Sequence, residues 1–340
     1  MIERREITRR AILGGALALA WTAPAHALSA GGRSLARQRA ATPPMVSLIV
    51  GSEPGRAADR AARAFAPFLE RHLREARIAV LNRPGGTGLT ALRLLADAEP
   101  GALAIGWASS PALPARMVDS AGAANLAERL RLVGAVQNEP IVIVAAAGTP
   151  PGTVRDLLRR AGEDPASLPL GTPPQGSAEH LAVLRLQALG GTALNVVAFP
   201  SAAAARHAAA QGPVAAAALA LSHVVAELRD GTLSGLGIAA PQRSEAIPEV
   251  PTLIESGLSL SAAILRGIAT PASAPDAWVS SLAAALRGVV ADPEYVAAAA
   301  ESGFLPALVD GPAWAALVAE EKGLLENLWR IAPWSTVAAG

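Results

Sequence analysis

The feature that most constrains this chain is a short apolar strand, a glycine-containing loop and an amphipathic helix in immediate succession. The strand begins at residue 46, the loop contains Pro54 and Gly55, and the helix extends to residue 72. Its apolar side chains recur at the spacing of one helix face, at Ala61, Phe65, Phe68 and Leu69. A loop that ends at a helix N-terminus offers free backbone N–H groups to an anion.

Related loops recur at residues 84–90 and 173–177, and each of them opens another predicted helix. A single loop of this kind is usually no more than a tight turn. Three of them in one chain, with Arg56 and Arg83 close to two of them, favour a protein that binds carboxylates or phosphates through backbone N–H groups.

Strands and helices alternate along the chain after residue 45. Strands are predicted at 77–81 and 102–108, with a helix at 89–98 between them. This alternation is typical of a parallel sheet with crossover helices, so the sequence predicts an α/β fold. Pro67 lies inside the first helix and is expected to kink or restart it, because an interior proline costs roughly 3 kcal/mol.

The rest of the chain predicts a second α/β half of similar layout. Two strands at 132–137 and 141–147 are expected to be separated by a break at Glu139 and Pro140. Thr153 is the expected N-cap of the helix that follows. Further strands are predicted at 195–199, 214–221, 236–240 and 260–270, and further helices at 125–130, 153–161, 178–189, 202–210, 224–229, 276–291, 293–302 and 312–329.

Composition narrows the class of protein. A chain of 340 residues is long enough for two domains, and with 51% hydrophobic and 17% charged residues it is not a disordered chain. The net charge of +1, without a basic run, excludes an ordinary nucleic-acid interface. The absence of cysteine excludes disulfides, thiolate catalysis and cysteine-ligated zinc.

The first residues carry a targeting pattern. Arg9 and Arg10 precede an apolar run at 11–21, and Ala25-His26-Ala27 has the form of a cleavage site. The sequence therefore predicts a twin-arginine signal peptide at 1–27, delivery to the periplasm, and a flexible mature N-terminus at 28–44. The alternative is a short membrane anchor, but the run falls short of the roughly 20 residues that span a bilayer. The mature protein is not expected to be membrane-embedded.

Residue patterns for catalysis, cofactors or metals are weak. Residues 86–91 match G-x-G-x-x-A, but the acidic residue that a dinucleotide site needs about 20 positions later is missing. The histidines do not have metal-binding spacings, and no G-x-S-x-G motif occurs. His180 either faces a ligand or has a solvated or capping role, which is favoured. Glu320 and Glu321 have a spacing typical of a solvated helix face. We therefore expect no cofactor, no metal and no enzymatic activity.

Several short motifs, in order along the chain, carry a resemblance to a known family. They are Pro54-Gly55 with Asp59 and Arg63, Asn82-Arg83-Pro84-Gly85 with Gly88, Gly176-Ser177 with His180-Leu181, Gln211-Gly212 with Val214, Arg243-Ser244 with Pro248-Glu249-Val250-Pro251-Thr252, and Ala291-Asp292-Pro293-Glu294. From about residue 46 to the C-terminal helix, the chain resembles the substrate-binding proteins of tripartite tricarboxylate transporters, the Bug family.

The resemblance implies an α/β type II periplasmic-binding-protein fold, with two lobes, a hinge and an interdomain cleft. On that template lobe 1 comprises 45–138 plus 263–340, and lobe 2 comprises 139–262. In the family, backbone amides and bridging waters hold a ligand carboxylate. Carried over to this chain, the ligand-binding residues are Ser52, Gly55, Arg56 and Asp59 on one side of the cleft, Gln175, Gly176 and Ser177 on the other, and Phe199 and Ser201 in a further cleft segment.

Departures from the family pattern suggest an altered ligand. Arg56 replaces a glycine, Ala58 a threonine, Ala215 an aspartate, and Phe199-Pro200 a tyrosine-lysine pair. The implied function is an exported solute-binding protein that captures a small carboxylate for the membrane subunits of a transporter. The alternatives are a periplasmic sensor that serves a signalling receptor and, less favoured, an enzyme that acts on a carboxylated substrate.

Overall fold

The computed structural model describes residues 44–73, 76–99, 101–164, 166, 168–302 and 304–334. The signal peptide predicted at 1–27 and, apart from Pro44, the N-terminal stretch predicted at 28–44 lie outside the described residues.

The chain first builds a parallel sheet from β1 (Met45–Val50), β2 (Arg77–Asn82) and β3 (Ala104–Ser110), with β1 between the other two. Helix α1 (Ala57–His72) connects β1 to β2, and η1 (Gly86–Gly88) with α2 (Leu89–Ala96) connects β2 to β3. The predicted strand–helix alternation is thus confirmed. Helix α1 continues through Pro67, so the expected restart is wrong; Phe65 and Leu69 on its inner face are fully buried and hold it on the sheet.

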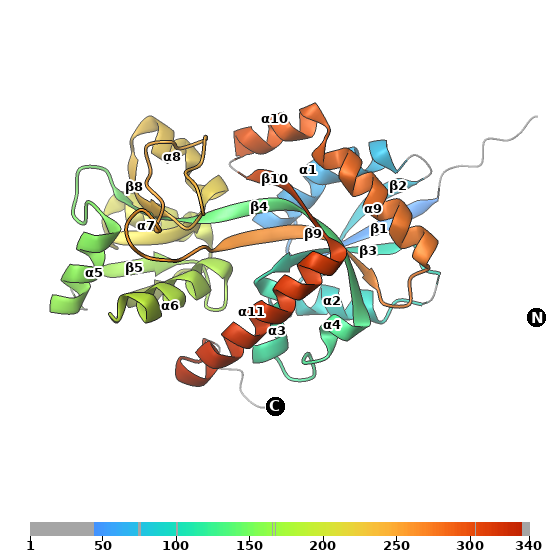
Figure 1. Ribbon diagram of the computed structural model, residues 1–340, viewed down its shortest axis with the longest axis horizontal. Coiled ribbons are helices and arrows are strands. Elements are labelled where there is room, and N and C mark those ends of the chain that lie inside the picture. The colour runs from blue at the N-terminus through green and yellow to red at the C-terminus, as the bar shows by residue number, and fades with distance from the viewer. Residues whose placement is uncertain are drawn as a thin grey trace, which may run out of the picture. The chain divides into compact units, whose positions relative to one another are not determined.

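Two hinge-like crossing strands follow. Strand β4 (Leu130–Ala146) lies antiparallel to β9 (Ala263–Pro271), and Figure 1 shows the two side by side. The break expected at Glu139 and Pro140 is wrong, because β4 is continuous there. Its residues before Ile141 pair with β9 and with β10 (Leu305–Asp310), whereas those from Ile141 pair with β7 (Ala216–Ala220) and β8 (Leu233–Ile238). Pro140 lies where the partners change, so its missing N–H interrupts neither ladder.

The segment after β4 forms the second group of strands and helices. Strands β5 (Pro169–Thr172) and β6 (Asn195–Ala198) are parallel, and β5 is also parallel to β7. The helices of this segment are α5 (Val154–Glu163), α6 (Ala178–Gly190), α7 (Ala202–Gln211) and α8 (Val225–Asp230), with the short η3 (Leu221–His223) after β7. The strand order through the whole sheet is β2-β1-β3-β9-β4-β7-β5-β6.

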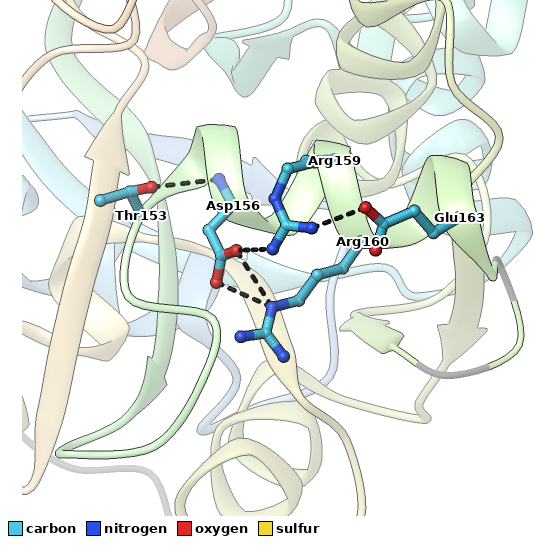
Figure 2. A network of polar contacts seen from close by, with 5 residues as sticks. All are labelled: Thr153, Asp156, Arg159, Arg160 and Glu163. Carbon is cyan, nitrogen blue, oxygen red and sulfur yellow. Dashed lines mark hydrogen bonds and ion pairs between the residues drawn. The ribbon is translucent and has the colours of Figure 1, made fainter.

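Helix α5 illustrates how local sequence sets an element's start. Thr153 is its N-cap, and the Thr153 hydroxyl accepts a hydrogen bond from the Asp156 backbone N–H at 3.1 Å, as the sequence predicts. Figure 2 shows the ion pairs that follow along the helix: Asp156 with Arg159 at 2.7 Å and with Arg160 at 2.9 Å, and Arg159 with Glu163 at 2.7 Å. Pairs at this spacing add a few tenths of a kcal/mol each.

The remaining helices return to the first group of strands. They are α3 (Ala112–Asp119), α4 (Leu126–Arg129), α9 (Asp276–Val290), α10 (Pro293–Ser302) and α11 (Gly311–Ile331). Helix α3 and strand β10 were not anticipated from the sequence. The C-terminal helix α11 is confirmed, and its Asp310 N-cap accepts from the Ala313 N–H at 2.8 Å.

Buried apolar side chains form separate clusters over the two groups of strands. One pair of clusters, around Phe65 and Trp314, uses residues between 46 and 136 and between 268 and 318. A second pair, around Leu157 and Leu219, uses residues between 141 and 264. The lobe boundaries at 138/139 and 262/263 stay a prediction.

Candidate functional site

The loop between β1 and α1 is shaped by one buried carboxylate. Asp59, only 2% exposed, accepts hydrogen bonds from the Gly55 backbone N–H at 2.8 Å, from Arg63 Nε at 2.9 Å and from Asn82 Nδ2 at 2.9 Å. Burial alone would raise the pKa of Asp59, but these donors lower it below its usual value. Both oxygens of Asp59 are therefore engaged within the first lobe's loop, where they fix its path.

Three other predicted residues of this loop lie around Asp59. Gly55 and Arg56 are exposed, and Arg56 forms no ion pair with any other described residue. Ser52 is half-buried, and its hydroxyl is enclosed without a hydrogen-bond partner among the described residues. Ser52 lines a cavity of about 290 Å³ together with Thr87, Gly88 and Ser109. An enclosed hydroxyl without a partner is available to a ligand or a water molecule.

The second predicted loop precedes α6. Gln175 is exposed and Gly176 is buried, while Ser177 is the N-cap and accepts from the His180 backbone N–H at 3.2 Å. His180 is itself buried, and its Nδ1 accepts a hydrogen bond from the Gly176 N–H at 3.4 Å. Burial lowers the pKa of His180, so the ring stays neutral and able to accept. Of the two roles favoured for His180, the solvated one is wrong, whereas the hydrogen bond from the Gly176 N–H next to the start of α6 is of the capping kind.

Arg116 connects the loops of the two segments. Its guanidinium donates to the Thr87 hydroxyl and to Asp119, and a Cβ placed on Gly176 would lie 2.8 Å from Arg116 Nη2. Thr87 belongs to η1, whose Gly88 Cα would lie 2.6 Å from a Cβ on Gly51. A chain of contacts therefore runs from the loop after β1, through the η1 turn and Arg116, to the Gly176 loop.

A tryptophan near the end of the chain completes this contact. Trp334 is buried, donates through Nε1 to Asp119 at 2.8 Å and packs edge-on against Trp329. Its Cδ1 would lie 2.8 Å from a Cβ on Gly176. Neither Arg116 nor Trp334 was predicted, because no local motif marks a residue whose partners are tens of positions away.

The third predicted segment has mainly local contacts. Ser201 is the N-cap of α7 and accepts from the Ala204 N–H at 3.1 Å. Phe199 is half-buried, packs on the cluster around Leu219, and donates its N–H to Thr172 O at 2.8 Å. Both contacts lie within the second group of strands and helices.

A buried ion pair lies across the two crossing strands. Glu139 of β4 is 1% exposed and pairs with Arg266 of β9, which is 8% exposed. The same carboxylate accepts from the Ser222 hydroxyl and, at 3.2 Å, from the Ser222 backbone N–H. Burial would raise the pKa of Glu139, but Arg266, His223 and the Ser222 hydroxyl lower it, so Glu139 is ionised. The sequence pattern predicted a strand break here and missed this cluster.

Charged groups near both loops influence pKa values in and around this cluster. Burial lowers the pKa of His223, and Arg60, whose guanidinium donates to Gly55 O at 2.6 Å, is close enough to lower it further. Burial also raises the pKa of Glu179, and the charge of Glu139 raises it further. Residues from the Gly55 loop, the Gly176 loop and the crossing strands thus share one electrostatic environment.

A cavity of about 940 Å³ lies elsewhere. It is lined by Asn138 and Leu265 of the crossing strands, by Arg185 of α6, and by Glu320 and Glu321 of α11, and by no residue of 52–59 or 173–177. Burial raises the pKa of Glu321 to about 7, with Glu320 adding to the rise and Arg185 opposing it. Glu321 is half-buried at this cavity.

The groups of this site are suited to binding a ligand. Backbone N–H groups at the starts of α1 and α6, a free Arg56 and an enclosed Ser52 hydroxyl suit a small anion. Among the described residues, no group of three or more His, Cys, Asp or Glu could hold a metal ion. Within the same residues, none of the helices combines the length and apolarity that crossing a bilayer requires.

Comparisons with known proteins agree with this geometry. The chain is 27% identical to protein BugT of Bordetella pertussis over 223 residues, which is 62% of this chain and 65%, less than two thirds, of BugT. A TctC solute-binding protein from Polaromonas has the same fold, with a TM-score of 0.72 at 24% identity over 85% of this chain and 98% of that one. MatC from Rhodopseudomonas palustris, solved with bound malate, gives 0.71 at 23% identity over 84% and 98%.

These likenesses confirm the predicted α/β, two-lobe periplasmic-binding fold. The model of the tripartite tricarboxylate transporter family receptor matches residues 62–328, most of the chain. That family consists of solute-binding receptors and is not a family of enzymes. This chain belongs to the tripartite tricarboxylate transporter receptor family, as the resemblance to Bug proteins predicted.

Proposed function

We propose that this protein is an exported receptor that captures a small carboxylate between the loops at 52–59 and 173–177 and delivers it to the membrane subunits of a transporter. The observation that carries the proposal is the contact between these loops through Thr87 and Arg116. This contact supports a site to which the N-termini of α1 and α6 both contribute, since their free N–H groups and dipoles favour an anion.

Residue roles within this site follow from their contacts. Ser52, Gly55 and Arg56 would meet the ligand from the first lobe, and Gln175, Gly176 and Ser177 from the second. Asp59 holds the first loop in shape, since its oxygens already accept three hydrogen bonds. Phe199 and Ser201 support the second lobe's side. The proposed lobes are 45–138 plus 263–340 and 139–262, with β4 and β9 passing between them.

Ligand class is supported by the family and by one neighbour. The family is described as a tricarboxylate transporter receptor, and MatC binds malate. The family is one of receptors, which supports binding without turnover as the activity.

A thermal-shift screen of mono-, di- and tricarboxylates on the mature chain tests the proposal, because a ligand that binds the native fold raises the melting temperature. We expect at least one carboxylate to raise it, and Arg56→Ala to weaken that ligand's binding by several-fold. Arg287→Ala is the matched control, since Arg287 is exposed on α9 and away from both loops. A flat response across the panel would refute carboxylate capture, and turnover of a bound compound would indicate an enzyme.

Delivery and export need separate tests. Loss of substrate uptake on deletion of the gene, restored by the wild-type protein, would support transport; an unchanged uptake with a lost signalling response would support a sensor. Arg9→Lys with Arg10→Lys should abolish twin-arginine export. Normal periplasmic delivery of that variant would contradict the twin-arginine prediction.

A further inference from the structure

A second recess lies between α6, α11 and the crossing strands. It consists of the cavity of about 940 Å³ described above and a smaller cavity of about 90 Å³ that shares part of its wall. Both are lined by Arg185 of α6, by Glu321 and Leu324 of α11, and by residues 261–263. In Figure 1, α6 and α11 both lie below β4 and β9. This α6–α11 recess is separate from the two ligand loops, which contribute no residue to its wall.

The wall of the α6–α11 recess exposes leucines to water. Leu305 of β10 is 43% exposed, and Leu317 and Leu324 of α11 are 42% and 50% exposed. Exposed apolar side chains that gather at one concave surface, rather than singly, mark a place where an apolar body binds. A cavity of this volume, with a largely apolar wall and a few polar groups, has the usual form of a small-molecule site.

Polar groups on the same wall offer hydrogen-bond acceptors. Asn138 Oδ1 is enclosed without a partner among the described residues. Glu320 and Glu321 form neither a hydrogen bond nor a salt bridge with another described residue. Carboxylates and an amide oxygen accept hydrogen bonds, so the group that satisfies them is a donor.

The charges of the wall favour a cation. It carries three carboxylates, because Glu245 joins the two of α11, and two arginines. Arg243 is already paired with Glu255 at 3.0 Å, which leaves Arg185 as the arginine of the wall that has no salt bridge to a described residue. Three carboxylates against one uncommitted guanidinium give the recess a net negative charge.

We infer that the α6–α11 recess binds a small organic cation with an apolar body, such as an alkylammonium compound. Its ammonium group donates to Glu320 and Glu321, and its apolar body covers the leucines of the wall. This site goes beyond carboxylate capture and does not depend on it.

The test is isothermal titration of the mature chain with octylammonium, octanol and butylammonium. Octylammonium and octanol share one chain and differ in charge, whereas the two amines share one charge and differ in length. We expect octylammonium to bind about 5-fold more tightly than octanol, the upper range of a partly exposed ion pair. Butylammonium should bind more weakly than octylammonium, by about 4-fold for each methylene group that the recess covers.

The protonation of Glu321 gives a second readout. Burial raises the pKa of Glu321 to about 7, Glu320 on the same helix adds to the rise, and Arg185 of α6 opposes it. Glu245 and Arg243 are the other charged groups of the wall. A cation binds the ionised carboxylate, so octylammonium, which stays charged throughout, should bind up to about 10-fold more tightly at pH 8 than at pH 6. Octanol should show no such dependence.

Variants separate the two parts of the recess. Glu320→Gln with Glu321→Gln should bring octylammonium to the affinity of octanol, and Leu324→Asn should weaken both compounds. Glu301→Gln, at an exposed position on α10, and Leu94→Asn, at an exposed position on α2, are the matched controls and should change neither affinity. Melting curves of all variants check that the fold is retained.

The inference is overturned if octylammonium does not bind, if it binds no more tightly than octanol, or if the double glutamine variant keeps the preference. A dimer that forms with rising concentration and that Leu324→Asn abolishes would overturn it as well, in favour of a second copy of this chain at the recess. Each of these results leaves carboxylate capture untouched, because the carboxylate screen tests that function by itself.

Discussion

Replacement of Arg266 by methionine tests the physical account of the crossing strands most directly. The change removes the guanidinium that pairs with Glu139 and keeps a side chain of similar length on β9. Glu139 is 1% exposed and Arg266 8%, so water cannot take the place of the lost partner. Breaking a buried ion pair from one side typically costs about 3–5 kcal/mol, because the remaining charge stays buried and uncompensated.

The magnitude expected for Arg266→Met lies in the lower half of that range. Glu139 keeps two hydrogen bonds from Ser222 and the influence of His223 in the variant. Each such hydrogen bond to a charged group contributes roughly 1.5–3 kcal/mol, which limits the penalty to about 3 kcal/mol. Glu139→Gln in the same chain removes the charge, and the double variant should regain most of the loss.

Urea unfolding at pH 7.5 of the wild type, both single variants and the double variant gives the coupling free energy. The pKa of Glu139 is lowered in the folded wild type, so the pair stabilises the fold above the unfolded pKa of 4.5 and this contribution is lost as pH falls through the folded pKa. The cost of Arg266→Met should therefore shrink only as pH falls below 4.5. A cost below about 1 kcal/mol, or a double variant no more stable than Arg266→Met, would refute the reasoning.

Three further changes probe other features. Glu321→Gln should stabilise the protein at pH 8 by about 1–2 kcal/mol and leave its stability unchanged at pH 4. The reason is that the pKa of Glu321 is raised to about 7 in the folded state, so the stability of the wild type declines as pH rises from the unfolded pKa of 4.5 to 7; partial exposure of Glu321 reduces the size of this decline. Equal changes at both pH values in urea unfolding would contradict this prediction. Gly176→Ala should lose about 1–2 kcal/mol or more, because its φ of +75° is unfavourable for a side chain and the Cβ would meet Arg116 and Trp334; an unchanged melting curve would show that the loop contact is absent in solution. Thr153→Ala should cost about 1 kcal/mol through the lost N-cap of α5, and Thr153→Ser should restore it, whereas a neutral Thr153→Ala would mean that the cap does not stabilise the helix.

Local sequence predicted the elements whose cause is local. The apolar run of β1, the loop before α1 and the cap Thr153 each depend on a few adjacent residues, and the structure has them where the pattern indicated. The strand break at Pro140 failed because a proline disrupts a strand only where its N–H would have a partner, and the partner change of β4 is not visible in the pattern.

In the candidate site, too, the features with a local cause were predicted and the long-range contacts were not. Glycines and small hydroxyl residues before helices marked the loops, since their conformational role is local. Arg116 meets Thr87 across 29 positions, and Arg266 meets Glu139 across 127. In a single sequence each of these side chains is one charged residue among many, and only the sheet order brings the partners together. The burial of His180 was not visible in the sequence either, because burial follows from packing.

One strand shared by two sets of neighbours makes the halves of this protein thermodynamically dependent on each other. If the ladders of β4 with β7 and β8 open, the whole strand becomes less ordered, and its pairing with β9 and β10 is weakened. Opening of the β9 and β10 ladders weakens the pairing with β7 and β8 in the same way. Heat or denaturant should accordingly melt the described region in one cooperative transition, with calorimetric and van't Hoff enthalpies in agreement.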